Sequence, residues 1–251
     1  MGDGALPGFV RLAGHPVRWL LMTELARSDL RVRELVGIVD EPQNLVSYHL
    51  KLLRDGGLVT SRRSSFDGRD TYYHLDLARC AEELEDLGTA LHPALRMTPV
   101  PTPPPRKTTG SSVLFVCSGN SARSPIAEAL LRHHAGTHLR VASAGTKPKD
   151  AVHPHAVRVL REHYDLDITR QRPRAIGSAE RTRFGHTITL CDKAREALPP
   201  TNGQRAHWSI PDPAAGRRKD LYPEFVAVAA EIDARVRQLL PSLSTTGDQE
   251  D

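Results

Sequence analysis

A proline-rich segment near the middle of the chain is the feature that most limits how this sequence can fold. Residues 93–110 read PALRMTPVPTPPPRKTTG. Proline lacks a backbone N–H and has a fixed φ, so such a run is excluded from helix interiors and central strands. It favours extended polyproline geometry and acts as a semi-rigid spacer. The sequence therefore predicts two domains, residues 11–92 and 111–241, joined by a linker at 93–110.

Length and composition fit two ordinary domains of a soluble globular protein. The chain has 251 residues, of which 39% are hydrophobic and 25% charged. The net charge of +4 permits binding to a polyanion without requiring it. No run approaches the roughly 18 apolar residues of a membrane span, and the N-terminus lacks the pattern of a secretory signal. Three distant cysteines, Cys80, Cys117 and Cys191, indicate reduced thiols rather than a disulfide framework, so a cytoplasmic protein without membrane contact is expected.

Helical periodicity dominates the first half of the chain. One helix is predicted to begin at Pro16, a second to cover residues 32–39, and a third to use Asp40 as its N-cap and to stop at Gly56. Two strands, LVTSRR and TYYHLDL, flank the polar loop SSFDG, and the segment AEELEDLGTALH closes the half as a helix. Three helices followed by a hairpin are the order of a winged helix-turn-helix.

The third predicted helix has the properties of a helix that reads DNA. Val46, Leu50 and Leu53 share one face and should pack inward, while polar side chains occupy the opposite face. Amide side chains can pair with adenine, and hydroxyl and basic groups can bond to phosphates. Arginines in the predicted hairpin would meet the DNA backbone or the minor groove. The candidate DNA contacts are Gln43, Asn44, Ser47, Tyr48, Lys51, Arg62, Arg63 and Arg69.

The segments HPVRWLLMTELARSD, VSYHLKLLRDGGLV and RRSSFDGRDTYYHLDL resemble the arsenical-repressor-like (ArsR) family of winged-helix proteins across residues 11–92. The resemblance implies a homodimeric repressor that binds a double-stranded operator and releases it on binding a metal or metalloid. The sensor site of that family has a Cys-x-Cys pair, but this chain reads ELVGIVD there. Cys80 is the only thiol of the module and is expected to pack as a small apolar residue. DNA binding is therefore predicted, and direct metalloid sensing is not.

Strands and helices alternate after the linker. Short β-branched or aromatic runs, SSVLFVC, LRVASAG and HTITLC, are separated by helical segments, and an amphipathic helix ends the domain around residues 225–240. Such alternation predicts an α/β domain whose parallel sheet is flanked by helices on both faces.

The segment VLFVCSGNSARSPIAEA, residues 113–129, carries the clearest chemical signal. A loop between a strand and a helix N-terminus directs N–H groups and the positive end of the helix dipole at an anion. This field should favour an ionised thiolate at Cys117. Arg123 would hold two oxygens of the anion in a fork, and Ser124 would donate a hydrogen bond to the sulfur. The predicted anion cradle consists of Ser118, Gly119, Asn120, Ser121, Ala122 and Arg123.

Displacement at an oxyanion also requires a general acid. Asp212, in HWSIPDPAAG, is the candidate because it precedes a proline in a predicted loop after a strand-like run. Residues 111–241 resemble the low-molecular-weight protein tyrosine phosphatase superfamily through the nucleophile loop, VASAGT at 141–146 and the Asp-Pro loop. The resemblance implies that Cys117 is the nucleophile, Arg123 the anion clamp and Asp212 the general acid.

Within that superfamily, the sequence is most similar to the thioredoxin-type arsenate reductases. Small residues follow the Asp-Pro pair where phosphatases place aromatic ones, and TLCDKA puts Cys191 at the position of the resolving cysteine. Two other cysteines of that branch are replaced by Ala122 and Leu198. Either Cys191 closes a disulfide with Cys117, or an external thiol such as mycothiol or glutathione attacks the adduct; thioredoxin is a further candidate reductant.

No cofactor or metal ion is predicted to be tightly bound. The histidines do not repeat at ligand spacing and are expected to be surface or packing residues. Glu128 and Ser143 match positions that hold potassium in some relatives, but Arg172 stands where an acidic partner is expected, so that site is not carried over.

Three functions remain open from the sequence. The first is an arsenate reductase fused to a regulator-like DNA-binding module. The second is a phosphatase, because arsenate and phosphate are nearly isosteric. The third is a transcription factor whose C-terminal half only senses an oxyanion.

Overall fold

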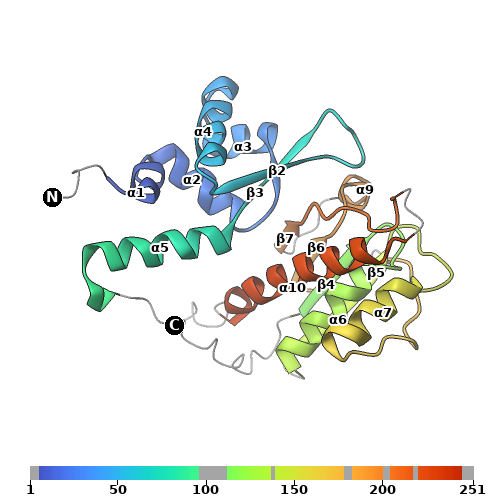
Figure 1. Ribbon diagram of the computed structural model, residues 1–251. Coiled ribbons are helices and arrows are strands. Elements are labelled where there is room, and N and C mark those ends of the chain that lie inside the picture. The colour runs from blue at the N-terminus through green and yellow to red at the C-terminus, as the bar shows by residue number, and fades with distance from the viewer. Residues whose placement is uncertain are drawn as a thin grey trace, which may run out of the picture. The chain divides into compact units, whose positions relative to one another are not determined.

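The computed structural model describes residues 6–95, 112–136, 139–177, 183–199, 204–216 and 220–244. Most of the predicted linker lies outside these residues. The chain divides into two compact units, Met1–Pro101 and Thr102–Asp251 (Figure 1). Each unit has a hydrophobic core of its own. Within the described part of the chain, no helix combines the length and apolar composition needed to cross a membrane.

The N-terminal unit consists of helices and a small antiparallel sheet. Its strands run in the order β1-β3-β2. The two-residue strand β1 and the short helix α1 were not predicted from the sequence. The elements are α1 (Gly8–Ala13), α2 (Pro16–Leu25), β1 (Leu30–Arg31), α3 (Val32–Val39), α4 (Gln43–Asp55), β2 (Val59–Arg63), β3 (Thr71–Leu75), α5 (Leu77–Leu91) and the 3-10 turn η1 (Pro93–Leu95).

The start of α4 corrects one prediction from the sequence. Asp40 does not cap α4; it has left-handed backbone angles (φ 54°, ψ 41°) and ends α3. Pro42 is the N-cap of α4 and provides no side-chain hydrogen bond. The residue before a proline is disfavoured in helical conformation, so the turn from α3 to α4 extends past Glu41.

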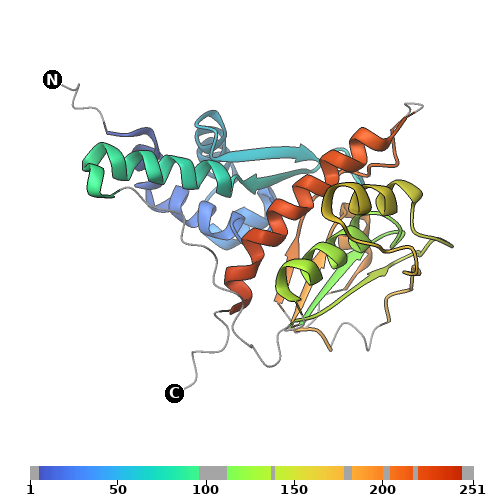
Figure 2. The same ribbon diagram turned by 60° about the horizontal axis from the view of Figure 1, so that its bottom comes forward.

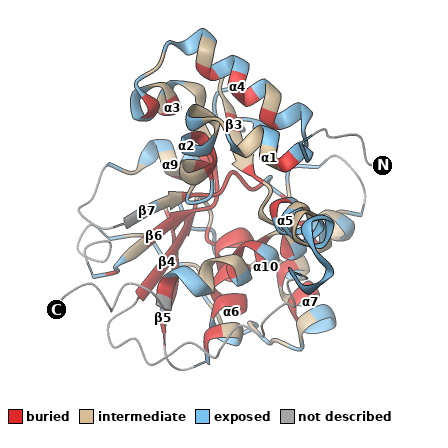
Figure 3. Cartoon of the chain, turned by 90° about the vertical axis from the view of Figure 1, so that its left-hand side faces the viewer, coloured by how far each residue is buried: buried red, intermediate tan, exposed pale blue. Residues whose placement is uncertain are grey.

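The core of the N-terminal unit has the predicted helix faces. Val46, Leu50 and Leu53 on α4 are each at most 1% exposed, and they pack in one cluster with Leu21 and Leu35 from α2 and α3. Figure 3 shows the alternation of buried and exposed residues along these helices. Burial of one face leaves the polar face of α4 at the surface.

The C-terminal unit is a four-stranded parallel sheet with flanking helices, which confirms the predicted fold class. The strand order is β5-β4-β6-β7. All six residues of the central strand β4 are buried, and α6, α7 and α10 pack together beside the sheet (Figure 2). The elements are β4 (Ser112–Cys117), α6 (Arg123–Ala135), β5 (Arg140–Gly145), α7 (Pro154–Tyr164), β6 (His186–Thr189), α9 (Asp192–Ala197), β7 (Gln204–His207) and α10 (Tyr222–Ser244).

The parallel pairing gathers the carboxyl ends of the strands at one edge of the sheet. Cys117 pairs with Gly145 at the end of β4 and β5, and Val116 pairs with Thr189 of β6. Thr189 in turn pairs with His207 of β7. In parallel sheets this edge is where ligands bind, so the functional groups are expected among the residues that follow these four strands.

Candidate active site

Cys117 is the last residue of β4, and the loop after it leads directly into α6 at Arg123. The thiol is buried, with the residue only 2% exposed. Its Sγ lies 3.0 Å from Ser124 Oγ and accepts a hydrogen bond from the Asn120 backbone N–H at 3.2 Å. Donors at these two positions stabilise a negative charge on sulfur.

The carbonyl groups of the nucleophile loop, residues 117–124, are turned away from its centre. The backbone N–H groups of Thr146, Lys147, Lys149 and His153 donate to the carbonyl oxygens of residues 117, 118, 119 and 121, at 3.1, 2.8, 2.9 and 2.7 Å. With those carbonyls bonded to groups outside the loop, the loop amides are the backbone groups left to bind a ligand. Among the described residues, the amides of Ser118, Gly119, Ser121 and Ala122 have no hydrogen-bond partner. The loop therefore has the donor set of an oxyanion cradle.

Arg123 lies at the start of α6 with its guanidinium fixed at the mouth of this loop. The residue is 6% exposed. Nη1 donates to the Ile210 carbonyl at 3.0 Å, and Nη2 lies 3.3 Å from Asp212 Oδ2. The buried Nε has no hydrogen-bond partner among the described residues. A buried, unpaired donor is costly, and an oxyanion bound in the cradle would supply the missing acceptor.

Asn120 gives the loop its shape. Its φ of 45° is left-handed, a conformation that Asn tolerates better than most residues. Its Nδ2 donates to Ser124 Oγ at 2.9 Å and to Ser143 Oγ at 2.8 Å, and its Oδ1 accepts from the Arg174 N–H at 2.9 Å. The side chain thus ties the loop to β5 and to the segment before β6.

The support behind the loop was largely missed from the sequence. Gln171 Nε2 donates to Glu128 Oε2 at 2.6 Å and to Ser143 Oγ at 3.4 Å. Arg174 Nε donates to the Ser143 carbonyl at 2.7 Å. The sequence had pointed to Ser143 through the VASAGT motif and to Glu128 and Ser143 as a pair, but it gave no indication of Gln171 or Arg174.

Gly145 also supports the loop, because a Cβ at this position would come within 2.7 Å of the Ser118 carbonyl oxygen. Any larger residue would therefore displace the loop backbone. The glycine follows Ser143 and Ala144 at the end of β5, so the strand and the nucleophile loop are packed backbone against backbone.

Cys191 follows β6 and lies against the nucleophile loop. Its Sγ is 3.3 Å from Ser118 Oγ and accepts from the Ala194 N–H at 3.4 Å. Burial raises the pKa of Cys191, while the charge of Arg123 opposes that shift and the charge of Cys117 adds to it. The structure thus brings a second, un-ionised thiol beside the cradle.

Asp212 lies in the loop after β7, about half-exposed and paired with Arg123 as described. Its Oδ1 accepts from the Ala214 N–H at 3.1 Å. The strand end before it is anchored by a buried network, in which Asp192 Oδ1 lies 3.1 Å from His207 Nε2 and accepts from Ser209 Oγ at 2.8 Å. The carboxyl group is thus held beside the Arg123 guanidinium and remains partly exposed to solvent.

His153 is a packing residue, as expected for the histidines, and it lies beside the nucleophile loop. Its N–H holds Ser121, as described, and its ring stacks on Phe225 with centroids 4.5 Å apart. Burial lowers the pKa of His153, the charges of His155 and Lys149 add to that shift, and Asp212 opposes it. No group of three or more His, Cys, Asp or Glu side chains among the described residues is arranged to hold a metal ion.

The candidate DNA contacts are all exposed in the N-terminal unit, on α4 and on the β2–β3 hairpin. Tyr48 is 55% exposed. Lys51 pairs with Asp55, and Arg63 Nη1 donates to the Gly68 carbonyl at 2.8 Å. Their exposure and their location on α4 and the hairpin are consistent with DNA contact. That role remains a prediction for Gln43, Asn44, Ser47, Tyr48, Lys51, Arg62, Arg63 and Arg69.

Comparison with known proteins assigns both units. Residues 112–249 match the model of the low molecular weight phosphotyrosine protein phosphatase family, which is more than half of the chain. The chain belongs to this phosphatase family. Residues 15–61 match the bacterial regulatory protein family arsR. Both resemblances drawn from the sequence are confirmed.

Several relatives of the phosphatase-family unit bear the name arsenate reductase. That of Brevibacillus brevis is 36% identical over 129 residues, which cover 51% of this chain and 92% of the relative. Arsenate reductase 1 of Staphylococcus haemolyticus is 33% identical over 134 residues, which cover 53% of this chain and 96% of that relative. A solved structure, the thioredoxin-dependent arsenate reductase of Corynebacterium glutamicum, is 21% identical, covers 89% of this chain and 96% of its own, and has a TM-score of 0.45. The C-terminal unit is thus homologous to arsenate reductases and is joined to an ArsR-type module.

Proposed function

We propose that residues 111–241 are a thiol-dependent arsenate reductase and that residues 11–92, joined through the linker at 93–110, are a DNA-binding regulatory module. The observation that most supports the reductase is the position of Cys191. A phosphatase of this family needs one thiol, whereas reduction of arsenate needs two. Cys191 Sγ lies 3.3 Å from Ser118 Oγ of the nucleophile loop, where a second thiol would be required.

In the first step, the Cys117 thiolate attacks the arsenic atom of arsenate. A sulfur–arsenic bond forms and the bond from arsenic to one of its hydroxyl groups breaks; the departing hydroxyl takes a proton from Asp212 and leaves as water. The loop amides and Arg123 carry the charge that builds on the remaining oxygens. Ser124, 3.0 Å from Cys117 Sγ, stabilises the thiolate before attack and the sulfur when it leaves.

In the second step, the Cys191 thiol gives up its proton, which passes to an oxygen on arsenic, and the resulting thiolate attacks Cys117 Sγ. A disulfide forms, the sulfur–arsenic bond breaks, and its electron pair stays on arsenic, which leaves as arsenite. Two thiols are oxidised and As(V) is reduced to As(III), so the electrons balance. Leu198 stands at the position of a relay cysteine, so the disulfide must be reduced by an external thiol or dithiol: mycothiol, glutathione or thioredoxin.

Thiol-dependent arsenite production by the purified chain tests this proposal, with the three reductants supplied in turn. Cys117→Ser should abolish turnover, and Asp212→Asn should reduce it. Cys191→Ser should lose arsenite production but keep hydrolysis of p-nitrophenyl phosphate. If Cys191→Ser reduces arsenate as well as the parent does, Cys191 is not the resolving thiol. If the parent hydrolyses the phosphate ester but never forms arsenite, the chain is a phosphatase. If it turns over neither substrate but binds an oxyanion tightly, it is a sensor.

The N-terminal module is proposed to bind a double-stranded operator as a homodimer. Exposed polar groups on α4 and arginines on the hairpin support DNA contact. Exposed leucines on α5 and η1 (Leu84, 40%; Leu91, 71%; Leu95, 51%) provide an apolar surface of the kind that a dimer interface covers. Light scattering should give a dimer, and Leu84→Glu with Leu91→Glu should yield a monomer with weaker binding to operator DNA. The arrangement would be excluded if the parent were a monomer, or if the double variant bound operator DNA as tightly as the parent does.

A further inference from the structure

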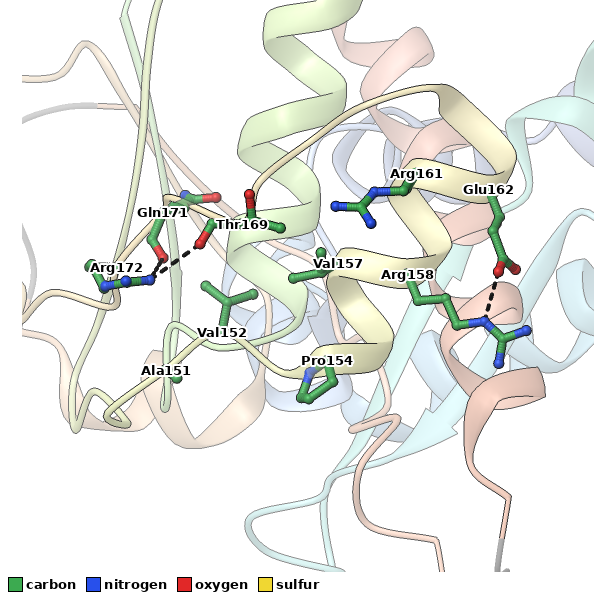
Figure 4. Close-up of a pocket in the computed structure, with 10 residues that line it drawn as sticks. All are labelled: Ala151, Val152, Pro154, Val157, Arg158, Arg161, Glu162, Thr169, Gln171 and Arg172. Carbon is green, nitrogen blue, oxygen red and sulfur yellow. Dashed lines mark hydrogen bonds and ion pairs between the residues drawn. The ribbon is translucent and has the colours of Figure 1, made fainter.

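A pocket of about 470 Å³ lies between α7 and the segment 169–172 of the C-terminal unit, and the mechanism above does not use it. None of its lining residues belongs to the nucleophile loop or to the Asp212 loop. Its volume lies within the range of small-molecule sites. Figure 4 shows Val152 and Val157 between two arginines, Arg161 from α7 and Arg172 from the opposite segment.

The charges around this pocket do not balance. Arg158 is occupied, because its Nε bonds to Glu162 Oε1 at 2.8 Å and its guanidinium lies 3.9 Å from the centre of the Tyr222 ring. Arg161 forms one ion pair, at 3.6 Å between Nη2 and Asp167 Oδ1, which leaves its other N–H groups available. Arg172 donates to the carbonyls of Thr169 and Gln171, at 3.2 and 3.4 Å, and has no carboxylate partner among the described residues. Two guanidinium groups thus have donors available for a ligand.

The arrangement of these groups defines a ligand class. A guanidinium binds a carboxylate through paired N–H donors. The floor between the two arginines is formed by the apolar groups of Ala151, Val152, Pro154 and Val157. A ligand with a carboxylate at each end and a short aliphatic spacer satisfies both arginines and covers the apolar floor.

One wall of the pocket is also part of the support behind the active-site thiol. Gln171 lines the pocket, and its side-chain amide donates to Glu128 and Ser143. Ser143 Oγ accepts from Asn120, which contacts both Ser124 and Cys117 Sγ. Arg172 bonds to the Gln171 carbonyl, so a ligand that draws Arg172 away would act on Gln171 first.

We propose that this pocket is a regulatory site for a small organic dicarboxylate, coupled to the nucleophile loop through Gln171. The site goes beyond the proposed reductase activity and does not depend on whether the substrate is arsenate. Its ligand would change the affinity of the cradle for oxyanions, and by reciprocity an oxyanion in the cradle would change the affinity for the dicarboxylate.

Calorimetric titration of the full chain with malonate, succinate and glutarate tests the site, with glutaramide as the neutral control. At least one dicarboxylate should bind saturably and glutaramide should not. The pair Arg161→Met and Arg172→Met should weaken binding at least 10-fold. Arg170→Met is the matched control, because Arg170 is an exposed arginine of the same segment that does not line the pocket; it should change affinity less than 2-fold. No saturable binding, or equal weakening by the control, would overturn the site.

Coupling is tested by the protection that phosphate gives Cys117 against iodoacetamide. A saturating dicarboxylate should shift the phosphate concentration for half-protection several-fold and then reach a plateau, as coupling predicts. Gln171→Leu should remove the shift while retaining dicarboxylate binding. If the half-protecting phosphate concentration rises without limit as dicarboxylate is added, the dicarboxylate is binding in the cradle itself. If Gln171→Leu shows the same plateau as the parent, or if the parent shows no shift, the proposed route through Gln171 is excluded.

Discussion

Replacing Asn120 with alanine should separate the loop from its support. The change removes three hydrogen bonds, the buried ones to Ser124 and Ser143 and the partly buried one from the Arg174 N–H, each contributing about 1 kcal/mol. Alanine must also adopt a φ of 45°, which costs about 1 kcal/mol more than it does for asparagine. The C-terminal unit should therefore lose about 3–4 kcal/mol of stability, which for a unit of this size lowers Tm by roughly 10 °C.

Trp208 provides the readout, because it lies 7% exposed in the core of the C-terminal unit. The other tryptophan, Trp19, is on α2 and is replaced by Phe in all variants, so that fluorescence reports one unfolding transition. Asn120→Gly should be about 1 kcal/mol less destabilising than Asn120→Ala, since glycine accepts positive φ. The exposed Asn44 supplies an Asn→Ala control that should leave the transition unchanged.

Alkylation of Cys117 gives a second readout of the same change. Without Asn120, Ser124 and the loop amides are less well held, and the rate with iodoacetamide at neutral pH should fall several-fold. These hydrogen bonds do not organise the loop if the stability of Asn120→Ala is within about 0.5 kcal/mol of the parent's and Cys117 is alkylated as fast as in the parent. A larger loss for Asn120→Gly than for Asn120→Ala would refute the argument from φ.

Three further predictions concern charge. Because burial raises the pKa of Cys191, single-turnover arsenite release should accelerate as pH rises from 7 to 9, when more of the thiol ionises; a flat profile would contradict a rate-limiting attack by this group. Burial, with the charges of Asp76 and Glu83, raises the pKa of Cys80 to about 11. Because the folded state prefers the neutral thiol, the stabilisation present below pH ~9 should be lost as the pH rises from about 9 to 11. Denaturant titrations of Cys80→Ala should show a smaller decline in the free energy of unfolding over this range. Replacing Lys51 with Gln should lower the salt slope of DNA binding by about 1, and an unchanged slope would remove it from the phosphate contacts.

Much of the nucleophile loop was predictable because its chemistry is local in sequence. The strand, the cysteine, the arginine and the start of α6 occur within one short segment, so residue type and spacing imply the cradle. Asp212 was proposed from the Asp-Pro pair in a loop after a strand-like run, and Cys191 only through a family resemblance; nothing in the spacing of either residue from Cys117 implies that they lie close together. The parallel pairing of β4 with β5 and β6 is what brings all these groups to one edge of the sheet.

The remainder of the site depends on contacts between distant segments. Gln171 and Arg174 reach the loop only because their segment runs beside β5, with Ala175 bridged to Gly145. A polar residue in a proline-containing stretch has no sequence pattern that indicates such a role. The start of α4 was misplaced for a local reason: Asp40 is a good N-cap type, but Asp also tolerates the left-handed angles that end a helix. The strand β1, of two residues, is too short to produce a periodic signal.

The bonds from Thr146 and Lys147 continue the β4–β5 ladder past the strand ends, and Lys149 and His153 bind the rest of the nucleophile loop from the segment that follows. Opening the cradle would thus require this edge of the central sheet to fray. Its four amide protons should exchange with deuterium slowly even though Lys147 and Lys149 are at the surface. Turnover would then begin without a closure step, and an inhibitor could be designed against a rigid receptor.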